Sequence, residues 1–204
     1  MQKILAGLLL FGNLSFLSAL EIEDFRISDI KQAKIEIPAP KMEIDKSKNN
    51  AYLWFHTYIN ESIKEISGYD YSTRIDIRVR KVFDDQFQAD IRVNNNYEWV
   101  TIRKVFNKDF DISGSAGYVN AREWGGNYNI SGNLRDENGK YQYLNLTMFK
   151  RFDDGFSFNI SANGLYLNVD KNDISGNFDE TIYSKKVLGY ILSTILAIEA
   201  NNIK

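Results

Sequence analysis

Hydrophobic and polar residues alternate with a period of two through the middle of the chain, from residue 71 to residue 169. The alternation is clearest in residues 74–80, 88–93, 127–135 and 156–163. A period of two places successive side chains on opposite faces of a strand, which is typical of antiparallel sheets with one buried and one solvated face. Clusters of Asn, Asp and Gly between these stretches are turn signals. The pattern predicts a seven-stranded curved antiparallel meander, an open barrel-like sheet.

The segments on either side of this region have wider apolar spacings. In residues 51–66 the apolar residues recur every two to four positions, and Gly68 follows as a stop signal, which predicts an N-terminal helix. Residues 179–201 carry a wide apolar stripe from Val187 to Ile198, which predicts a C-terminal helix. We expect both helices to pack on the apolar face of the sheet, giving an α+β fold.

The chain begins with the features of a cleavable signal peptide, residues 1–19. Lys3 supplies the positive charge, a mainly apolar stretch follows, and Ser18-Ala19 supplies small residues before an acidic segment. The apolar part is shorter than the roughly 20 residues of a membrane-spanning helix, so a retained inner-membrane anchor is the alternative. We predict an extended tether in residues 20–50 and a single β-rich domain with flanking helices in residues 51–204. The expected location is exported, either periplasmic or secreted.

The amino-acid composition excludes several kinds of site and partner. The chain has no cysteine, which excludes disulfides, thiolate metal sites, thiol nucleophiles and a thiol-linked lipid anchor. Hydrophobic residues make up 44% of the chain, enough to build a core without disulfide support. The formal net charge of −2 disfavours nucleic acid as a partner.

Catalytic groups are sparse. His56 is the single histidine and lies beside aromatic residues, and no second His or Cys completes a metal set. The chain has no G-x-S-x-G motif for a serine nucleophile. Paired carboxylates occur at Asp84-Asp85, Asp136-Glu137 and Asp153-Asp154, all at predicted turns where acids are common. A carboxylate-dependent hydrolase, with Asp153 or Asp170 as the best candidates, is therefore an alternative and not the favoured hypothesis.

Residues 170–180 form the stretch richest in oxygen ligands, and a calcium site there is conceivable on composition. Its glycine and acids miss the EF-hand positions, so we favour a plain loop that leads into the last helix. No metal and no cofactor are predicted.

The aromatic residues suggest a binding site. Trp99, Tyr118, Trp124, Tyr128 and Phe158 are the candidates for lining a pocket between the curved sheet and the closing helix. Small residues in the same region leave space for one, namely Gly114, Ala116, Gly132, Ala162 and Gly164. The alternative is that these aromatic residues are ordinary core.

We therefore expect an exported, non-enzymatic protein that binds a small apolar or amphipathic ligand or a cell-envelope partner. A small outer-membrane β-barrel is the second hypothesis, because a signal peptide and alternating strands also fit that class. The Arg and Asp residues on the polar face of the first strands favour a solvated face with cross-strand ion pairs. The alternative is a polar surface that recognises an anionic or glycan partner.

Overall fold

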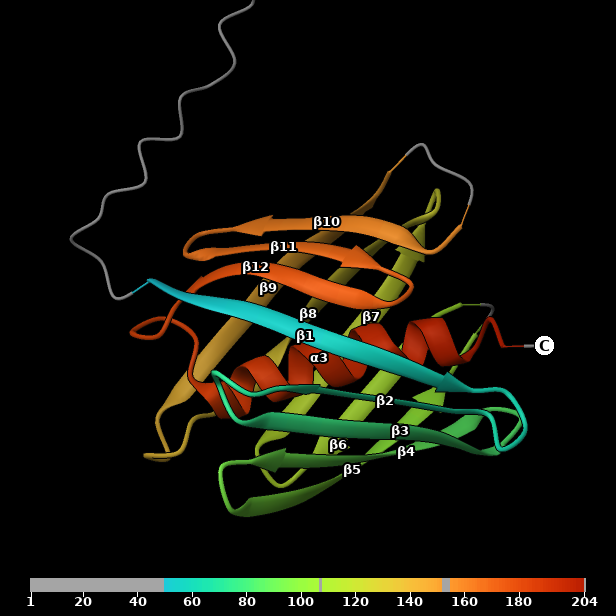
Figure 1. Cartoon of the computed structure of the whole chain (residues 1–204), viewed down its shortest axis with the longest axis horizontal. Coiled ribbons are helices and arrows are strands. Elements are labelled where there is room, and N and C mark those ends of the chain that lie inside the picture. Colours follow the sequence, from blue (N-terminus) through green and yellow to red (C-terminus); the bar gives the residue numbers. More distant parts are fainter. Residues whose placement is uncertain (1–49, 107, 152–154, 204) are drawn as a thin grey trace, which may run out of the picture. The chain divides into compact units, whose positions relative to one another are not determined.

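The structure, a computed structural model, describes residues 50–106, 108–151 and 155–203. Twelve strands form one closed antiparallel barrel in which each strand pairs with the next along the chain and β12 pairs with β1 (Figure 1). The strands are β1 (Asn50–Asn60), β2 (Glu65–Asp70), β3 (Ile75–Phe83), β4 (Gln86–Val93), β5 (Asn96–Lys104), β6 (Phe110–Gly114), β7 (Gly117–Trp124), β8 (Asn127–Arg135), β9 (Tyr141–Lys150), β10 (Ser157–Ala162), β11 (Leu165–Asp170) and β12 (Asp173–Asp179). One described helix, α3 (Lys185–Ala200), follows them.

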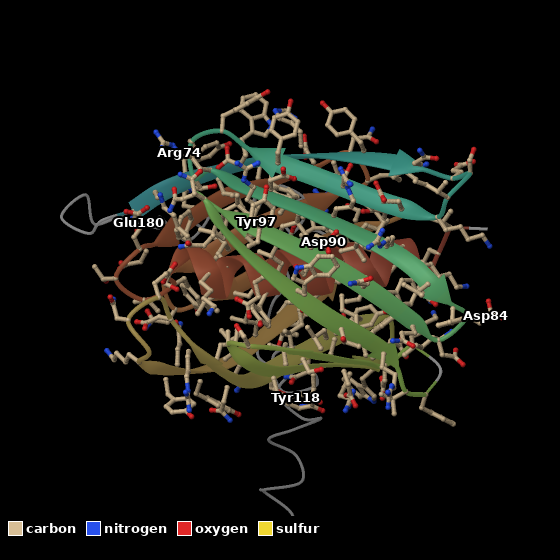
Figure 2. All side chains as sticks on the ribbon, turned by 90° about the horizontal axis from the view of Figure 1, so that it is seen from below. Arg74, Asp84, Asp90, Tyr97, Tyr118 and Glu180 are labelled. Carbon is tan, nitrogen blue, oxygen red and sulfur yellow. The ribbon has the colours of Figure 1, made fainter. Side chains whose placement is uncertain are left out.

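The alternation of the sequence decides which face of each strand points inward. In β3, Ile75, Ile77 and Val79 are buried, and the residues between them are exposed. Figure 2 shows the side chains of Asp90 and Tyr97 on the outer face of the neighbouring strands. A closed sheet with this pattern has an apolar interior and a polar outer surface.

Helix α3 fills the interior of the barrel. All fourteen residues from Val187 to Ala200 are buried, which requires protein on every side of the helix. Figure 1 shows the helix between β1 and β2 in front and β6 and β7 behind. The buried hydroxyls of Ser193 and Thr194 donate to the carbonyls of Gly189 and Tyr190, at 2.7 and 2.8 Å, so the helix satisfies its own polar side chains.

The prediction of a seven-stranded open meander was wrong, because the sheet has twelve strands and is closed. Two stretches that we predicted as single strands are each divided by a two-residue turn, Ser115-Ala116 between β6 and β7 and Asn163-Gly164 between β10 and β11. Three further strands come from segments outside the predicted meander, β1, β2 and β12. Closure joins β1 to β12 across most of the described chain, in a register from Asn50 opposite Asp179 to His56 opposite Asp173.

The predicted N-terminal helix was also wrong, because residues 51–66 form β1 and the start of β2. Leu53 and Phe55 point inward, whereas Trp54 and Tyr58 point outward and are about half exposed, at 53% and 56%. Aromatic residues on both faces resemble a broad helical stripe in the sequence. Gly68 does not end a helix but lies in β2, where a Cβ atom would be 2.3 Å from the ring of Phe55.

The C-terminal helix exists, but it begins at Lys185 and is enclosed, whereas we expected it to start near residue 179 and to pack on an open sheet. Residues 170–180 are not a loop, since they contain the end of β11 and all of β12. Ser184 caps the helix by accepting the N–H of Val187 at 3.3 Å. Because α3 fills the interior, the surfaces open to a ligand are the ends and the outer face of the barrel.

Candidate functional site

A group of aromatic side chains covers the outer surface of β1 and β2. We call it the aromatic wall, and its members are Tyr52, Trp54, His56, Tyr58, Tyr69 and Tyr71. Strand periodicity puts the β1 members on one face, and pairing of His56 with Tyr69 brings β2 alongside. Tyr71, in the turn after β2, is 82% exposed.

Five of the six rings of the wall, all except that of Tyr52, are linked by ring contacts. Centroids are 5.3 Å apart between Trp54 and His56 and 6.0 Å apart between His56 and Tyr69. Tyr69 then stacks on Tyr58 at 6.0 Å with 11° between the ring planes, and meets Tyr71 edge-on at 4.6 Å. Hydrogen bonds with Tyr58 and with Tyr71 raise the pKa of the Tyr69 hydroxyl. The wall is therefore an ordered aromatic surface and not a set of isolated side chains.

Amide and hydroxyl groups and one carboxylate border the wall on the β12 side. Asn177 lies opposite Tyr52, and Ser175 lies opposite Trp54, while Asp173 lies opposite His56. The next strand continues this border, because Tyr166 pairs with Asn177 and Asn168 pairs with Ser175. The wall thus adjoins a surface of amide and hydroxyl groups.

This sector of the barrel contains no basic side chain in its strands. None of the five strands β10, β11, β12, β1 and β2 includes Lys or Arg. Strands β3 to β5, by contrast, contain Arg78, Arg80, Lys81, Arg92, Arg103 and Lys104. Basic strand residues therefore lie near the wall on its β3 side and not on its β12 side.

Two of the five predicted ligand residues lie together at the barrel end where α3 finishes. The rings of Tyr128 and Phe158 are 6.1 Å apart and edge-on, and Phe156 extends the pair. They line a hollow of about 340 Å³ whose floor includes Ile198 and whose rim includes Lys150. Burial raises the pKa of Tyr128 to about 12.

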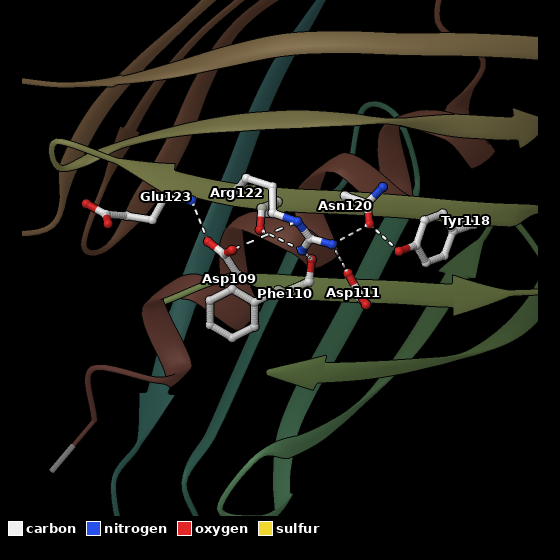
Figure 3. Close-up of polar contacts among 8 residues, drawn as sticks. Asp109, Phe110, Asp111, Tyr118, Asn120, Arg122 and Glu123 are labelled. Carbon is white, nitrogen blue, oxygen red and sulfur yellow. Dashed lines mark hydrogen bonds and ion pairs between the residues drawn. The ribbon is translucent and has the colours of Figure 1, made fainter. Parts of the chain in front are cut away.

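The other three predicted residues lie on the outer surface. Trp99 and Trp124 are 63% and 84% exposed. Tyr118 belongs to a polar network on β6 and β7, in which its hydroxyl donates to Asn120 (Figure 3). Arg122 is the centre of this network, because it donates to Asp111 at 2.6 Å and to Asn120 at 2.9 Å. The hydrogen bonds of Arg122 link β7 to β6, so the network stabilises the sheet.

A second polar cluster anchors the start of α3. The buried hydroxyl of Tyr190 donates to Glu98, and the N–H of Ala116 donates to the same carboxylate at 2.9 Å. Ser115 also donates to Glu98, at 2.7 Å, and Lys186 forms an ion pair with it at 3.2 Å. Burial would raise the pKa of Glu98, but the hydrogen bonds from Tyr190, Ser115 and Ala116 outweigh burial and lower it. This cluster joins β5, the β6–β7 turn and the helix.

Two of the catalytic candidates, His56 and Asp170, lie within the described residues. The described residues contain no group of three His, Cys, Asp or Glu side chains placed to hold a metal ion. His56 is part of the aromatic wall, and Asp170, one hydrolase candidate, pairs with Arg151 and accepts from Ser157. The other candidate, Asp153, lies outside the described residues. No helix in the described part of the chain is long and apolar enough to cross a membrane.

No protein family model, no curated protein and no solved structure matches the chain. The wall was missed at the sequence level because residues 51–66 were interpreted as a helix. The alternation of Tyr52, Trp54, His56 and Tyr58 with inward residues was the signal that could have revealed it.

Proposed function

We propose that this chain is an exported, non-enzymatic β-barrel that binds a neutral glycan on the aromatic wall. The single observation that carries the proposal is the contact of five exposed or half-exposed aromatic rings, from Trp54 to Tyr71, beside a surface of Asn and Ser side chains. Contiguous exposed apolar surface with a polar rim is typical of interaction sites. Export rests on residues 1–19, and fractionation of cells that express the full chain tests it.

The chemistry of the wall favours a sugar over other polymers. The C–H faces of a sugar ring pack on aromatic faces, while its hydroxyls bond to amide, hydroxyl and carboxylate groups such as those of Asn177, Ser175 and Asp173. Nucleic acid or an acidic glycan needs basic residues beside the aromatic rings. Strands β10 to β12, β1 and β2 have none, and Arg78 of the adjoining β3 is already held by an ion pair with Glu65 at 3.3 Å. A neutral glycan satisfies both the stacking and the hydrogen-bonding groups.

The three tryptophans make the proposal testable by fluorescence. A Trp99→Phe, Trp124→Phe variant keeps Trp54 as the single tryptophan. Titration with neutral oligosaccharides of glucose, mannose and N-acetylglucosamine should shift the emission of Trp54. Trp54→Ala should weaken binding roughly tenfold to a hundredfold, because a stacking contact contributes on the order of 1–3 kcal/mol.

Trp99→Ala is the matched control, since Trp99 is exposed to a similar degree as Trp54 but lies on β5, outside the wall. It should leave binding measured by calorimetry unchanged. Equal losses in the two variants would place the sugar elsewhere. Failure of every oligosaccharide to bind at millimolar concentration would end the glycan proposal.

A small membrane-inserted barrel is the second candidate. A closed barrel with an even number of antiparallel strands, twelve here, favours it. A lipid-facing barrel also needs an outward apolar band about 25 Å tall, and the outward residues at the middle of β3 and β4 are Arg78 and Asp90. We therefore rank it below a glycan-binding barrel. Extraction decides between them, because the membrane barrel requires detergent to leave the membrane fraction.

A further inference from the structure

The seam between β9 and β10 is the least paired contact between neighbouring strands of the barrel. It has three register pairs, joining residues 148–150 to residues 158–160. Every other neighbouring pair in the described barrel has five or more. Figure 1 shows the two strands diverging from the end at which they pair. Residues 141–147 therefore pair with β8 on one edge and with no described strand on the other.

The unpaired edge of residues 141–147 presents backbone N–H and C=O groups and lacks the residues that usually prevent a second strand from pairing with an edge. In an antiparallel strand, alternate residues direct their N–H and C=O groups to the same edge. Exposed edges usually contain Lys, Pro or a bulge that prevents pairing with a second chain. Residues 141–147 read Tyr-Gln-Tyr-Leu-Asn-Leu-Thr, and their register with β8 is unbroken. This edge has the form of a template for strand addition.

A hollow of about 590 Å³ lies along the same edge, within the range of ligand sites. Tyr141, Tyr143 and Asn145 line it from β9. Its opposite wall consists of Ala162 at the end of β10, Asn163 in the turn that follows, and residues 180–184, which lead into α3. Space is thus present where a further strand would hydrogen-bond to β9.

We propose that the seam takes up an extended peptide segment of a partner protein, which adds as a strand to residues 141–147 of β9. At about 3.4 Å per residue, this edge offers roughly 24 Å of backbone to pair with. Repeated backbone donors and acceptors match another peptide backbone better than they match a sugar.

The lining of the hollow defines the chemistry of the segment. Ile182 on the opposite wall favours an apolar or β-branched residue at alternate positions of the incoming strand. Asp136 and Glu180 provide two carboxylates, which Lys140 and the Lys185 ion pair with Glu180 balance. The segment should therefore be uncharged.

Hydrogen exchange of the free full chain, resolved by residue, gives the first test. Alternate amides within residues 141–147 should exchange roughly a hundredfold or more faster than the amides in the middle of β8, because they lack a partner strand. Uniform protection along β9 would mean that the edge is already paired, and would overturn the proposal.

Selection of random seven-residue displayed peptides on the full chain gives the second test. Enriched peptides should alternate β-branched and polar residues, slow exchange within residues 141–147, and bind roughly tenfold or more weakly after N-methylation of alternate residues. Tyr143→Lys, an exposed position where Lys opposes strand addition, should abolish enrichment. Enrichment that is equal on this variant, absence of enrichment on the full chain, or insensitivity to N-methylation would each overturn the proposal.

The same measurements separate this site from the aromatic wall. Trp54→Ala should bind the selected peptides normally, whatever becomes of the glycan. A neutral oligosaccharide that perturbs Tyr141 and Tyr143 without slowing amide exchange, and that displaces the peptides, would show that the hollow is a sugar site. That outcome would overturn the strand-addition proposal.

Discussion

At the scale of single residues, Glu199 has the most unfavourable environment among the described carboxylates. Its side chain is buried near the end of α3, and its Oε1 atom has no hydrogen-bond partner. Burial raises its pKa to about 8 from an ordinary value of 4.5, and Lys171 offsets only part of that shift. A carboxylate at a helix C-terminus is also opposed by the helix dipole. The residue therefore makes the stability of the barrel depend on pH.

The direction of this dependence follows from proton linkage. Below pH 4.5 the carboxyl is protonated in both the folded and unfolded chain, and between pH 4.5 and about 8 only the unfolded chain ionises. The free energy of unfolding should therefore fall as pH rises through this window, by on the order of 5 kcal/mol in total. Glu199→Gln should remove the dependence and stabilise the protein at pH 8.

Urea denaturation at several pH values from 5 to 8 measures the effect. Glu61→Gln, in the exposed turn between β1 and β2, is the control and should keep the slope of the unmodified chain. A flat profile in the unmodified chain would show that Glu199 is ionised and solvated in the folded state.

Individual positions were predictable where burial follows a period of two. Ile75, Ile77 and Val79 were assigned correctly to one buried face. The pattern assigned no face to the aromatic residues: Phe158 is 5% exposed and Trp99 is 63% exposed, although both lie in the alternating region. Aromatic side chains suit either face of a sheet, so their side is decided by the register of pairing, which the sequence does not display.

At the scale of elements, the hairpin of β1 and β2 depends on a close approach at Gly68. A Cβ atom there would lie 2.3 Å from the ring of Phe55 and 2.8 Å from the carbonyl oxygen of His56. Gly68→Ala should therefore lower the free energy of unfolding by about 1–3 kcal/mol through overpacking.

Thermal or urea denaturation tests this effect, with Ser67→Ala as the control on the outward face of the same strand. The control should change stability by less than about 0.5 kcal/mol. An unchanged stability of Gly68→Ala would mean that Phe55 and its neighbours move aside freely, and that the wall is backed by a looser core than the structure indicates.

Elements were predicted well at most turns that contain Asn, Asp or Gly, although the Asn163-Gly164 turn between β10 and β11 was missed. Gly125-Gly126 and Asn138-Gly139 correctly separate β7, β8 and β9. The Ser115-Ala116 turn has its glycines only at the flanking strand ends, Gly114 and Gly117. It depends also on the contacts of Ala116 with Glu98 and Tyr190, which are distant in sequence. The aromatic wall was not predicted either, because it forms only if residues 50–60 are a strand.

At the scale of the whole molecule, closure of the barrel could not be read from the sequence. It joins residues 50–56 to residues 173–179, and local periodicity carries no information about such a pairing. Closure also explains why the apolar stripe of the last helix is so wide. A helix on an open sheet buries one face, whereas Val187 to Ala200 are buried on all sides.

The enclosed helix should be indispensable to the barrel. Eight large apolar side chains of α3 are buried, namely Val187, Leu188, Tyr190, Ile191, Leu192, Ile195, Leu196 and Ile198. At roughly 1.5–3 kcal/mol each, their burial outweighs the roughly 5–15 kcal/mol by which a whole domain is stable. A chain that ends at Ser184 should therefore lose its cooperative thermal transition and accumulate as insoluble protein.

A chain that ends at Ala200 is the matched control, and it should retain the transition because α3 is intact. Adding a synthetic peptide of residues 185–204 during refolding of the truncated chain should restore solubility, since the helix supplies contacts and not the chain connection. If the truncated chain instead unfolds cooperatively and binds an apolar dye, the barrel stands without its filling. The interior would then be a ligand cavity that α3 occupies, and the apolar-ligand hypothesis drawn from the sequence would regain its site.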